Sequence, residues 1–133
     1  MIVFKYKNEF GRNQEVIKRP VCDVYLRSNR DEWIEFHPYI DSGADMTLIP
    51  LSLGKLIGLS TDKKSPEKIG GISGSIPVIY HEVMIKIARY RFPILISWAQ
   101  IEKVPPLLGR KDIFDFFNVS FRQKKGIVIF EKA

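Results

Sequence analysis

Short runs of alternating apolar and polar residues recur along the chain, and a period of two is typical of β-strands with one buried face. We expect strands at 2–7, 15–18, 21–27, 32–37, 39–40, 46–49, 82–87, 92–98, 107–108, 119–122 and 127–131. Turn-forming residues separate these runs at 8–13, 28–31, 88–91 and 123–126. The pattern predicts a mostly β fold.

Two stretches depart from this alternation. Residues 50–58 allow one or two helical turns that end at Gly58. Residues 110–117 place their apolar side chains in a compact helical register before Asn118. We therefore expect one short C-terminal helix.

Residues 67–80 have the composition of a β-hairpin whose tip contains Gly70, Gly71 and Gly74. A glycine-rich phosphate loop is the alternative interpretation. No Gly-Lys-Ser/Thr follows, however, and no helix pattern begins where a phosphate would need a helix N-terminus. The hairpin is favoured.

The length and composition fit one globular domain over residues 1–133, in which 1–19 form either an N-terminal extension or edge strands. Hydrophobic residues make up 45% and charged residues 27% of the chain, the balance of a soluble protein. The longest apolar run, 92–99, is too short to span a bilayer, and the polar start lacks the core of a signal peptide. We expect a cytoplasmic protein without membrane contact.

The net charge of +6 permits contact with nucleic acid, but the cations are scattered, and the one tight cluster, 122–125, lies at an expected hairpin tip. We expect no nucleic-acid partner. The single Cys22 excludes an internal disulfide and is expected in a strand rather than as a nucleophile. Because His37 and His81 lack the spacing of metal ligands, we expect no metal and no cofactor.

The stretch 39–50 contains Asp-Ser-Gly between two apolar arms. Gly43 allows a tight turn, so that the Asp41 carboxylate is presented at a loop tip on a rigid base. Alone, this triplet is ordinary turn chemistry and more often structural than catalytic.

Three motifs occur in order: Asp-Ser-Gly-Ala at 41–44, the glycine-rich stretch at 68–78, and Pro-Leu-Leu-Gly-Arg-Lys-Asp-Ile at 106–113. Together they resemble the retropepsin family of aspartic proteases over about residues 20–131. The resemblance implies a closed β-barrel protomer with a glycine-rich flap hairpin and a short C-terminal helix. It also implies an aspartic endopeptidase that acts on extended polypeptides without a cofactor.

Peptide hydrolysis by carboxylates needs two of them, one to accept a proton from water and one, protonated, to polarise the scissile carbonyl. The chain has one Asp-Ser-Gly turn, so a complete site requires two copies of Asp41 at the axis of a homodimer. The alternative is a catalytically inactive module of the same fold that binds peptides or dimerises.

The resemblance also assigns roles to single residues. Asp41, Ser42 and Gly43 form the catalytic turn, and Ser42 bonds across the dimer axis. The residues expected to contact substrate are Ala44, Asp45, Gly70, Gly71, Ile72 and Leu107. The side-chain pockets are expected to be mainly apolar, formed by Tyr39, Ile72, Ile76, Val104 and Leu107.

Arg110 is expected to support the site by pairing with Asp45. We favour a buried pair, because Arg110 follows two leucines and its guanidinium matches a carboxylate. The alternative is a surface pair that contributes about 1 kcal/mol or less.

Overall fold

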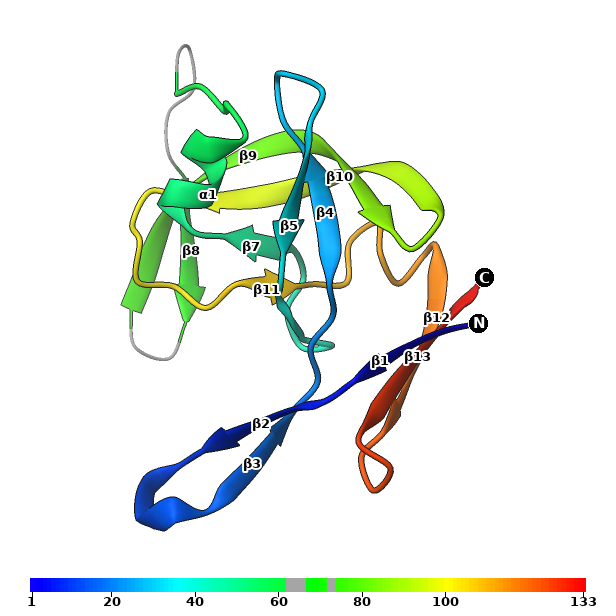
Figure 1. The fold of residues 1–133 in the computed structure, drawn as a ribbon. Coiled ribbons are helices and arrows are strands. Elements are labelled where there is room, and N and C mark those ends of the chain that lie inside the picture. The colour runs from blue at the N-terminus through cyan, green and yellow to red at the C-terminus, as the bar shows by residue number, and fades with distance from the viewer. Residues whose placement is uncertain (62–66, 72–73) are drawn as a thin grey trace.

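The computed structural model describes the backbone of residues 1–61, 67–71 and 74–133, and the side chains of residues 1–61 and 75–133 (Figure 1). Strands account for about half of the described residues and helices for less than a tenth, which confirms a mostly β fold. A large curled sheet forms the body, and a smaller sheet and a separate hairpin adjoin it.

The large sheet has the strand order β5-β4-β9-β10-β7-β11-β6, and β8 pairs with β9. Its strands are β4 (Val24–Arg27), β5 (Trp33–Phe36), β6 (Tyr39–Ile40), β7 (Thr47–Ile49), β8 (Glu67–Gly71), β9 (Gly74–Ile87), β10 (Tyr90–Ala99) and β11 (Leu107–Leu108). The antiparallel pair β9–β10 is its longest pairing. The register runs from the pair Ile87–Tyr90 to the pair Val78–Ala99. The expected hairpin over 67–80 is confirmed as β8 and the first half of β9.

The smaller sheet contains β1 (Ile2–Lys5), β13 (Ile127–Lys132) and β12 (Phe117–Arg122) in that order. The cationic cluster 122–125 lies at the turn between β12 and β13, as expected, and Gly126 there has a positive φ of 66°. Both chain ends lie beside this sheet (Figure 1).

The third unit is a hairpin of β2 (Lys7–Phe10) and β3 (Val16–Arg19), which we call the arm. A short 3-10 turn, η1 (Arg12–Gln14), lies at its tip. The arm extends away from the body (Figure 1). The expected turn over 8–13 is therefore too early, because β2 continues to Phe10, which pairs with Val16.

The core lies within the large sheet and between it and the smaller sheet, and its largest fully buried side chains include Trp98, Phe117 and Phe130. The helix α1 (Leu51–Leu56) packs on it at the position expected for helical turns. The Trp98 indole N–H donates to the Leu51 carbonyl at 3.1 Å. Gly54 faces the same indole, and a Cβ at Gly54 would overlap it. Cys22 is buried in this core, where burial and the neighbouring Asp23 raise the pKa of its thiol.

The prediction of a C-terminal helix over 110–117 is wrong, because residues 111–116 form successive turns. Helix-type bonds join the Phe114 N–H to the Arg110 carbonyl and the Phe117 N–H to the Ile113 carbonyl, each at 2.9 Å. Asp112 interrupts them with a left-handed φ of 66°. Its carboxylate instead accepts a hydrogen bond from the Leu95 N–H at 2.8 Å, which ties the turn to β10.

Candidate active site

The turn that follows β6 holds Asp41 through its own main chain. The Asp41 N–H donates to the Leu108 carbonyl at 3.0 Å, and the Asp41 carbonyl accepts from the Ala44 N–H at 3.2 Å. The Gly43 N–H donates to Oδ1 of Asp41 at 2.9 Å. One carboxylate oxygen is thus oriented by the backbone of the turn, and the side chain is half-buried at the tip.

Strand β11 lies between the two strands that flank this turn. It runs parallel to β6 and antiparallel to β7, so that Leu107 is opposite both Tyr39 and Leu48. The Gly109 N–H after β11 donates to the buried Thr47 hydroxyl at 3.1 Å. A Cβ at Gly109 would overlap the main chain of Met46, so only glycine permits this approach.

The two residues after Gly109 extend the contact between this segment and the Asp41 turn. The Arg110 N–H donates to the Ala44 carbonyl, and the Lys111 N–H donates to the Asp45 carbonyl, each at 2.9 Å. The segments 41–47 and 107–111 are therefore joined along their length by main-chain hydrogen bonds. Such a frame can present a carboxylate in one fixed position.

The chain as a whole is similar to solved structures, including two proteases. The EIAV protease in complex with the inhibitor HBY-793 is 25% identical over 78% of this chain and 90% of that chain, with a TM-score of 0.57. A retropepsin-like aspartic protease from Rickettsia conorii is 14% identical over 96% of this chain and 95% of that chain, with a TM-score of 0.63. The fold is retropepsin-like. By sequence, no protein-family model and no curated protein matches the chain.

Within this retropepsin-like fold, the structure brings together most of the residues expected at the site. Asp41, Ser42, Gly43, Ala44 and Asp45 follow one another in the turn, beside Leu107 and Arg110 of the second segment. Gly70 and Gly71 lie in β8, where they pair with Ser75 and Gly74. Ile72 lies outside the described residues, so the flap role of this hairpin stays a prediction.

The expectation of a buried Asp45–Arg110 pair is wrong for the single chain. The side chains approach to 3.8 Å between Nη1 of Arg110 and Oδ1 of Asp45, but Asp45 is 94% and Arg110 59% exposed. The reason is that backbone groups of both residues make the connection between the segments, which leaves the side chains outside it. In the protomer, Asp45 and Arg110 therefore form the exposed surface pair that was the alternative expectation.

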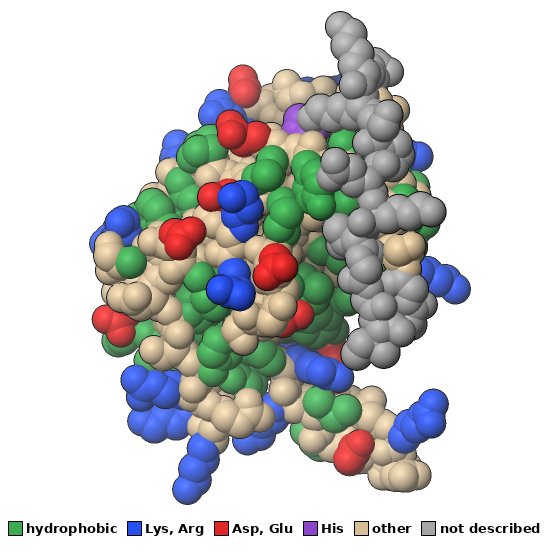
Figure 2. All heavy atoms as spheres, turned by 180° about the vertical axis from the view of Figure 1, so that it is seen from behind, with side chains coloured by type: hydrophobic (Ala, Val, Ile, Leu, Met, Phe, Trp, Pro, Cys, Tyr) green, Lys and Arg blue, Asp and Glu red, His purple; other side chains and the backbone are tan. Residues whose placement is uncertain are grey.

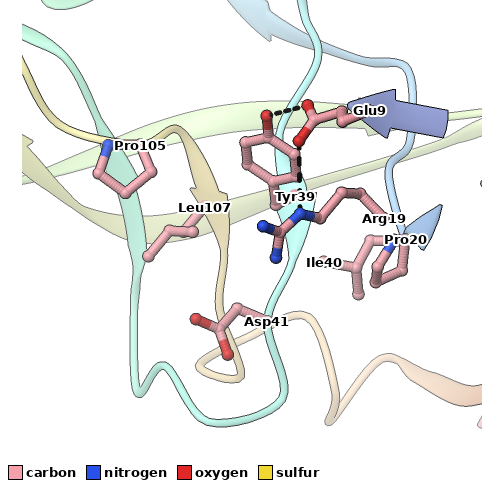
Figure 3. A pocket seen from close by; sticks show the side chains of 8 residues that line it. All are labelled: Glu9, Arg19, Pro20, Tyr39, Ile40, Asp41, Pro105 and Leu107. Carbon is pink, nitrogen blue, oxygen red and sulfur yellow. Dashed lines mark hydrogen bonds and ion pairs between the residues drawn. The ribbon is translucent and has the colours of Figure 1, made fainter. Parts of the chain in front are cut away.

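A pocket of about 470 Å³ lies beside Asp41 (Figure 3). Its lining comes from the arm, from β6 and from the segment around β11, through Glu9, Arg19, Pro20, Tyr39, Ile40, Asp41, Pro105 and Leu107. The sequence predicted Tyr39 and Leu107 as pocket residues and missed the charged pair from the arm. Nothing local marks Glu9 or Arg19, because the arm approaches Tyr39 across 30 residues of chain.

The charged wall of the pocket is a connected network. The Tyr39 hydroxyl donates to Oε2 of Glu9 at 2.6 Å. Oε1 of Glu9 lies 3.3 Å from Nε of Arg19, and Nζ of Lys7 lies 3.4 Å from Oε2. The Tyr39 hydrogen bond, followed by Lys7 and Arg19, lowers the pKa of Glu9, and the same hydrogen bond raises the pKa of Tyr39.

Metal sites and membrane-spanning helices each have requirements that the described residues do not meet. Among the residues that the structure describes, no group of three or more His, Cys, Asp or Glu side chains is placed to hold a metal ion. Nor does any helix in the described part of the chain have the length and apolar character to cross a membrane.

Proposed function

We propose that this chain is an aspartic endopeptidase whose active site forms from the Asp41 turns of two copies of the chain. The observation that carries the proposal is the Asp41 turn itself, whose carboxylate is oriented by the Gly43 N–H and whose backbone is fixed to β11. The likeness to two retropepsin-like proteases supports the same conclusion.

The chemistry requires two carboxyl groups of opposite role. One Asp41 carboxylate accepts a proton from the attacking water, while the protonated Asp41 of the second copy polarises the scissile carbonyl. Because the sequence has one Asp-Ser-Gly turn, the second carboxyl comes from a second copy on a two-fold axis. Ser42 then bonds across the axis and keeps the two carboxyl groups coplanar.

The substrate binds as an extended strand. In this arrangement Gly43 and Asp45 contact the substrate backbone, and Ala44 and Leu107 contribute to a side-chain pocket. Gly70, Gly71 and Ile72 cover the substrate from the other side as a flap. Binding by strand addition gives affinity through the main chain and leaves selectivity to the pockets.

The test is cleavage of a peptide library by the wild type and by Asp41→Asn. The substitution keeps the shape of the side chain but removes its ability to take up a proton, so turnover should fall at least about 100-fold. Asp115→Asn is the matched control, because Asp115 is exposed, and it should leave turnover unchanged.

Sedimentation and circular dichroism of each variant show whether fold and association are retained. Equal cleavage by wild type and Asp41→Asn would overturn the proposal. A wild type that dimerises and binds peptides without cleaving them would instead identify the inactive module.

A further inference from the structure

The pocket beside Asp41 has two chemically different walls. Tyr39, Ile40, Pro105 and Leu107 come from the body and provide a largely apolar surface, and the sequence predicted Tyr39 and Leu107 among them as pocket residues. The arm provides the other wall with Glu9 and Arg19, and Pro20 follows directly after the arm. A volume of about 470 Å³ is in the range of pockets that bind small ligands and so accommodates a single side chain.

Arg19 is the residue of the arm that is directed into this space. Figure 3 shows its guanidinium group between the Tyr39 ring and the Asp41 carboxylate, with the end of the group toward Leu107. Its Nε faces Glu9 at 3.3 Å, so the two terminal nitrogens are presented to the pocket. A guanidinium held at Nε keeps the planar pair of N–H donors that matches a carboxylate.

Glu9 serves to position Arg19 rather than to bind a ligand. Both of its oxygens are engaged, one by Arg19 and the other by the Tyr39 hydroxyl and Lys7. These contacts also lower the pKa of Glu9, which keeps the carboxylate charged and paired at neutral pH.

The wider charge of this end of the molecule has the same sign as Arg19. Residues 5–19 carry five Lys or Arg and two Glu, half of the chain's net charge of +6. In the view from behind, Lys and Arg side chains gather around the β12–β13 hairpin, whereas the arm shows both cationic and acidic side chains (Figure 2). A positive field at the mouth of a pocket concentrates anionic ligands there.

We propose that the arm forms one wall of a substrate subsite beside Asp41, and that Arg19 in this wall selects a carboxylate of the substrate. The inference rests on the proposed peptidase function and adds the preferred substrate chemistry. The carboxylate belongs either to an Asp or Glu side chain or to the C-terminus of a peptide, and both present the same two oxygens to the guanidinium.

The experiment compares peptides that differ at one position. Glu, Gln, Lys and Leu are placed in turn at each position around the cleaved bond of a neutral peptide, with free and amidated C-termini. A charge-assisted hydrogen bond to Arg19 should raise kcat/KM for Glu over Gln by about 10-fold or more at one position. If the C-terminal carboxylate is the ligand, amidation should reduce kcat/KM by a similar factor.

Two substitutions connect this preference to Arg19. Arg19→Met keeps the approximate length of the side chain and should bring the ratio of kcat/KM for Glu over Gln close to one. Arg19→Lys keeps the charge but lacks the planar pair of N–H donors, so it should give an intermediate ratio. Lys18→Met, on the same strand, is the matched control and should leave the ratio at its wild-type value. Thermal unfolding of each variant checks that the arm substitutions leave the fold intact.

Binding to the Asp41→Asn variant separates this inference from the proposed function. Peptide binding measured by fluorescence anisotropy should show the same preference for a carboxylate, and adding Arg19→Met should remove it. This result would support the subsite even without turnover. Cleavage without any carboxylate preference would overturn the subsite alone, as would a preference for Lys that Glu9→Gln abolishes.

Discussion

The Asp41 turn and the arm line the same pocket, but the protein holds them in different ways. The turn is fixed by main-chain hydrogen bonds to β11 and by the buried contact between Gly109 and Thr47. The arm contacts the body through the hydrogen bond from Tyr39 to Glu9, whereas the ion pairs of Glu9 with Lys7 and Arg19 lie within the arm. Its two outermost apolar residues, Phe10 and Val16, are 80% and 57% exposed.

The rigid turn and the less firmly held arm suit two different requirements of the proposed peptidase. Positioning of the reacting carboxyl groups tolerates little error, and buried main-chain hydrogen bonds provide that rigidity. A side-chain pocket can adapt to its ligand, and a wall that a side-chain hydrogen bond holds to the body is free to do so. We therefore expect substitutions near the turn to affect stability and turnover, and substitutions in the arm to affect selectivity.

The largest effect is expected at Gly109. A Cβ at this position would overlap the Met46 main chain, which cannot move without disturbing the Asp41 turn. Gly109→Ala should lower the free energy of unfolding by about 1–3 kcal/mol and abolish cleavage. Chemical denaturation and the peptide assay measure both quantities.

The matched substitution in the arm is Gly11→Ala. There a Cβ would meet side-chain atoms of Ile17 and Glu15, which can rotate away. Its loss of stability should be well below that of Gly109→Ala. Equal losses at the two glycines would contradict the contrast between a rigid turn and an adaptable arm.

A smaller effect, confined to the docking of the arm, is expected when the pH is lowered. The pKa of Glu9 lies below its ordinary value of 4.5, chiefly because the Tyr39 hydroxyl donates to it. A group with a lowered folded pKa contributes stability that is complete above its unfolded pKa and is lost as the pH falls through the folded value. The arm should therefore be docked at neutral pH and detach below pH 4.5.

Hydrogen exchange of the β2 and β3 amides as a function of pH measures this detachment, with the β6 and β11 amides as the internal reference. Glu9→Gln retains Glu15 on the arm but should remove the acid-dependent step. If the step persists in Glu9→Gln, another group controls the docking of the arm.

The smallest effect is expected from Arg110→Ala. Its pair with Asp45 is long and exposed in the protomer, so the free energy of unfolding should fall by about 1 kcal/mol or less. Lys111→Ala at the neighbouring exposed position provides the reference. A loss of about 3–5 kcal/mol would show that association of two chains buries the pair after all.

Local patterns in the sequence were sufficient for much of the framework. Alternation predicted most strands, and the glycines of 67–80 predicted the β8–β9 hairpin, because side-chain period and turn chemistry are local properties. The Asp41 turn was predicted in the same way. The apolar spacing of 110–117 was misleading, because Asp112 adopts a left-handed conformation while its carboxylate bonds to Leu95 of β10.

The arm wall of the pocket could not be predicted from the sequence. Glu9 and Arg19 become site residues because the fold places them beside Tyr39, and neither residue has a spacing that reveals this contact. The exposure of Arg110 was missed for a related reason. Two leucines before an arginine indicate a buried segment, but they do not show that its backbone, rather than its side chain, makes the connection.

The most direct test of the shared active site is a subunit-mixing experiment. Wild-type and Asp41→Asn chains are combined at a constant total concentration, high enough for association, and cleavage is measured at each ratio. If each site needs Asp41 from two copies, activity per wild-type chain should fall in proportion to the wild-type fraction, to about half in an equal mixture. Activity per wild-type chain that stays constant at every ratio would contradict a site built from two Asp41 turns.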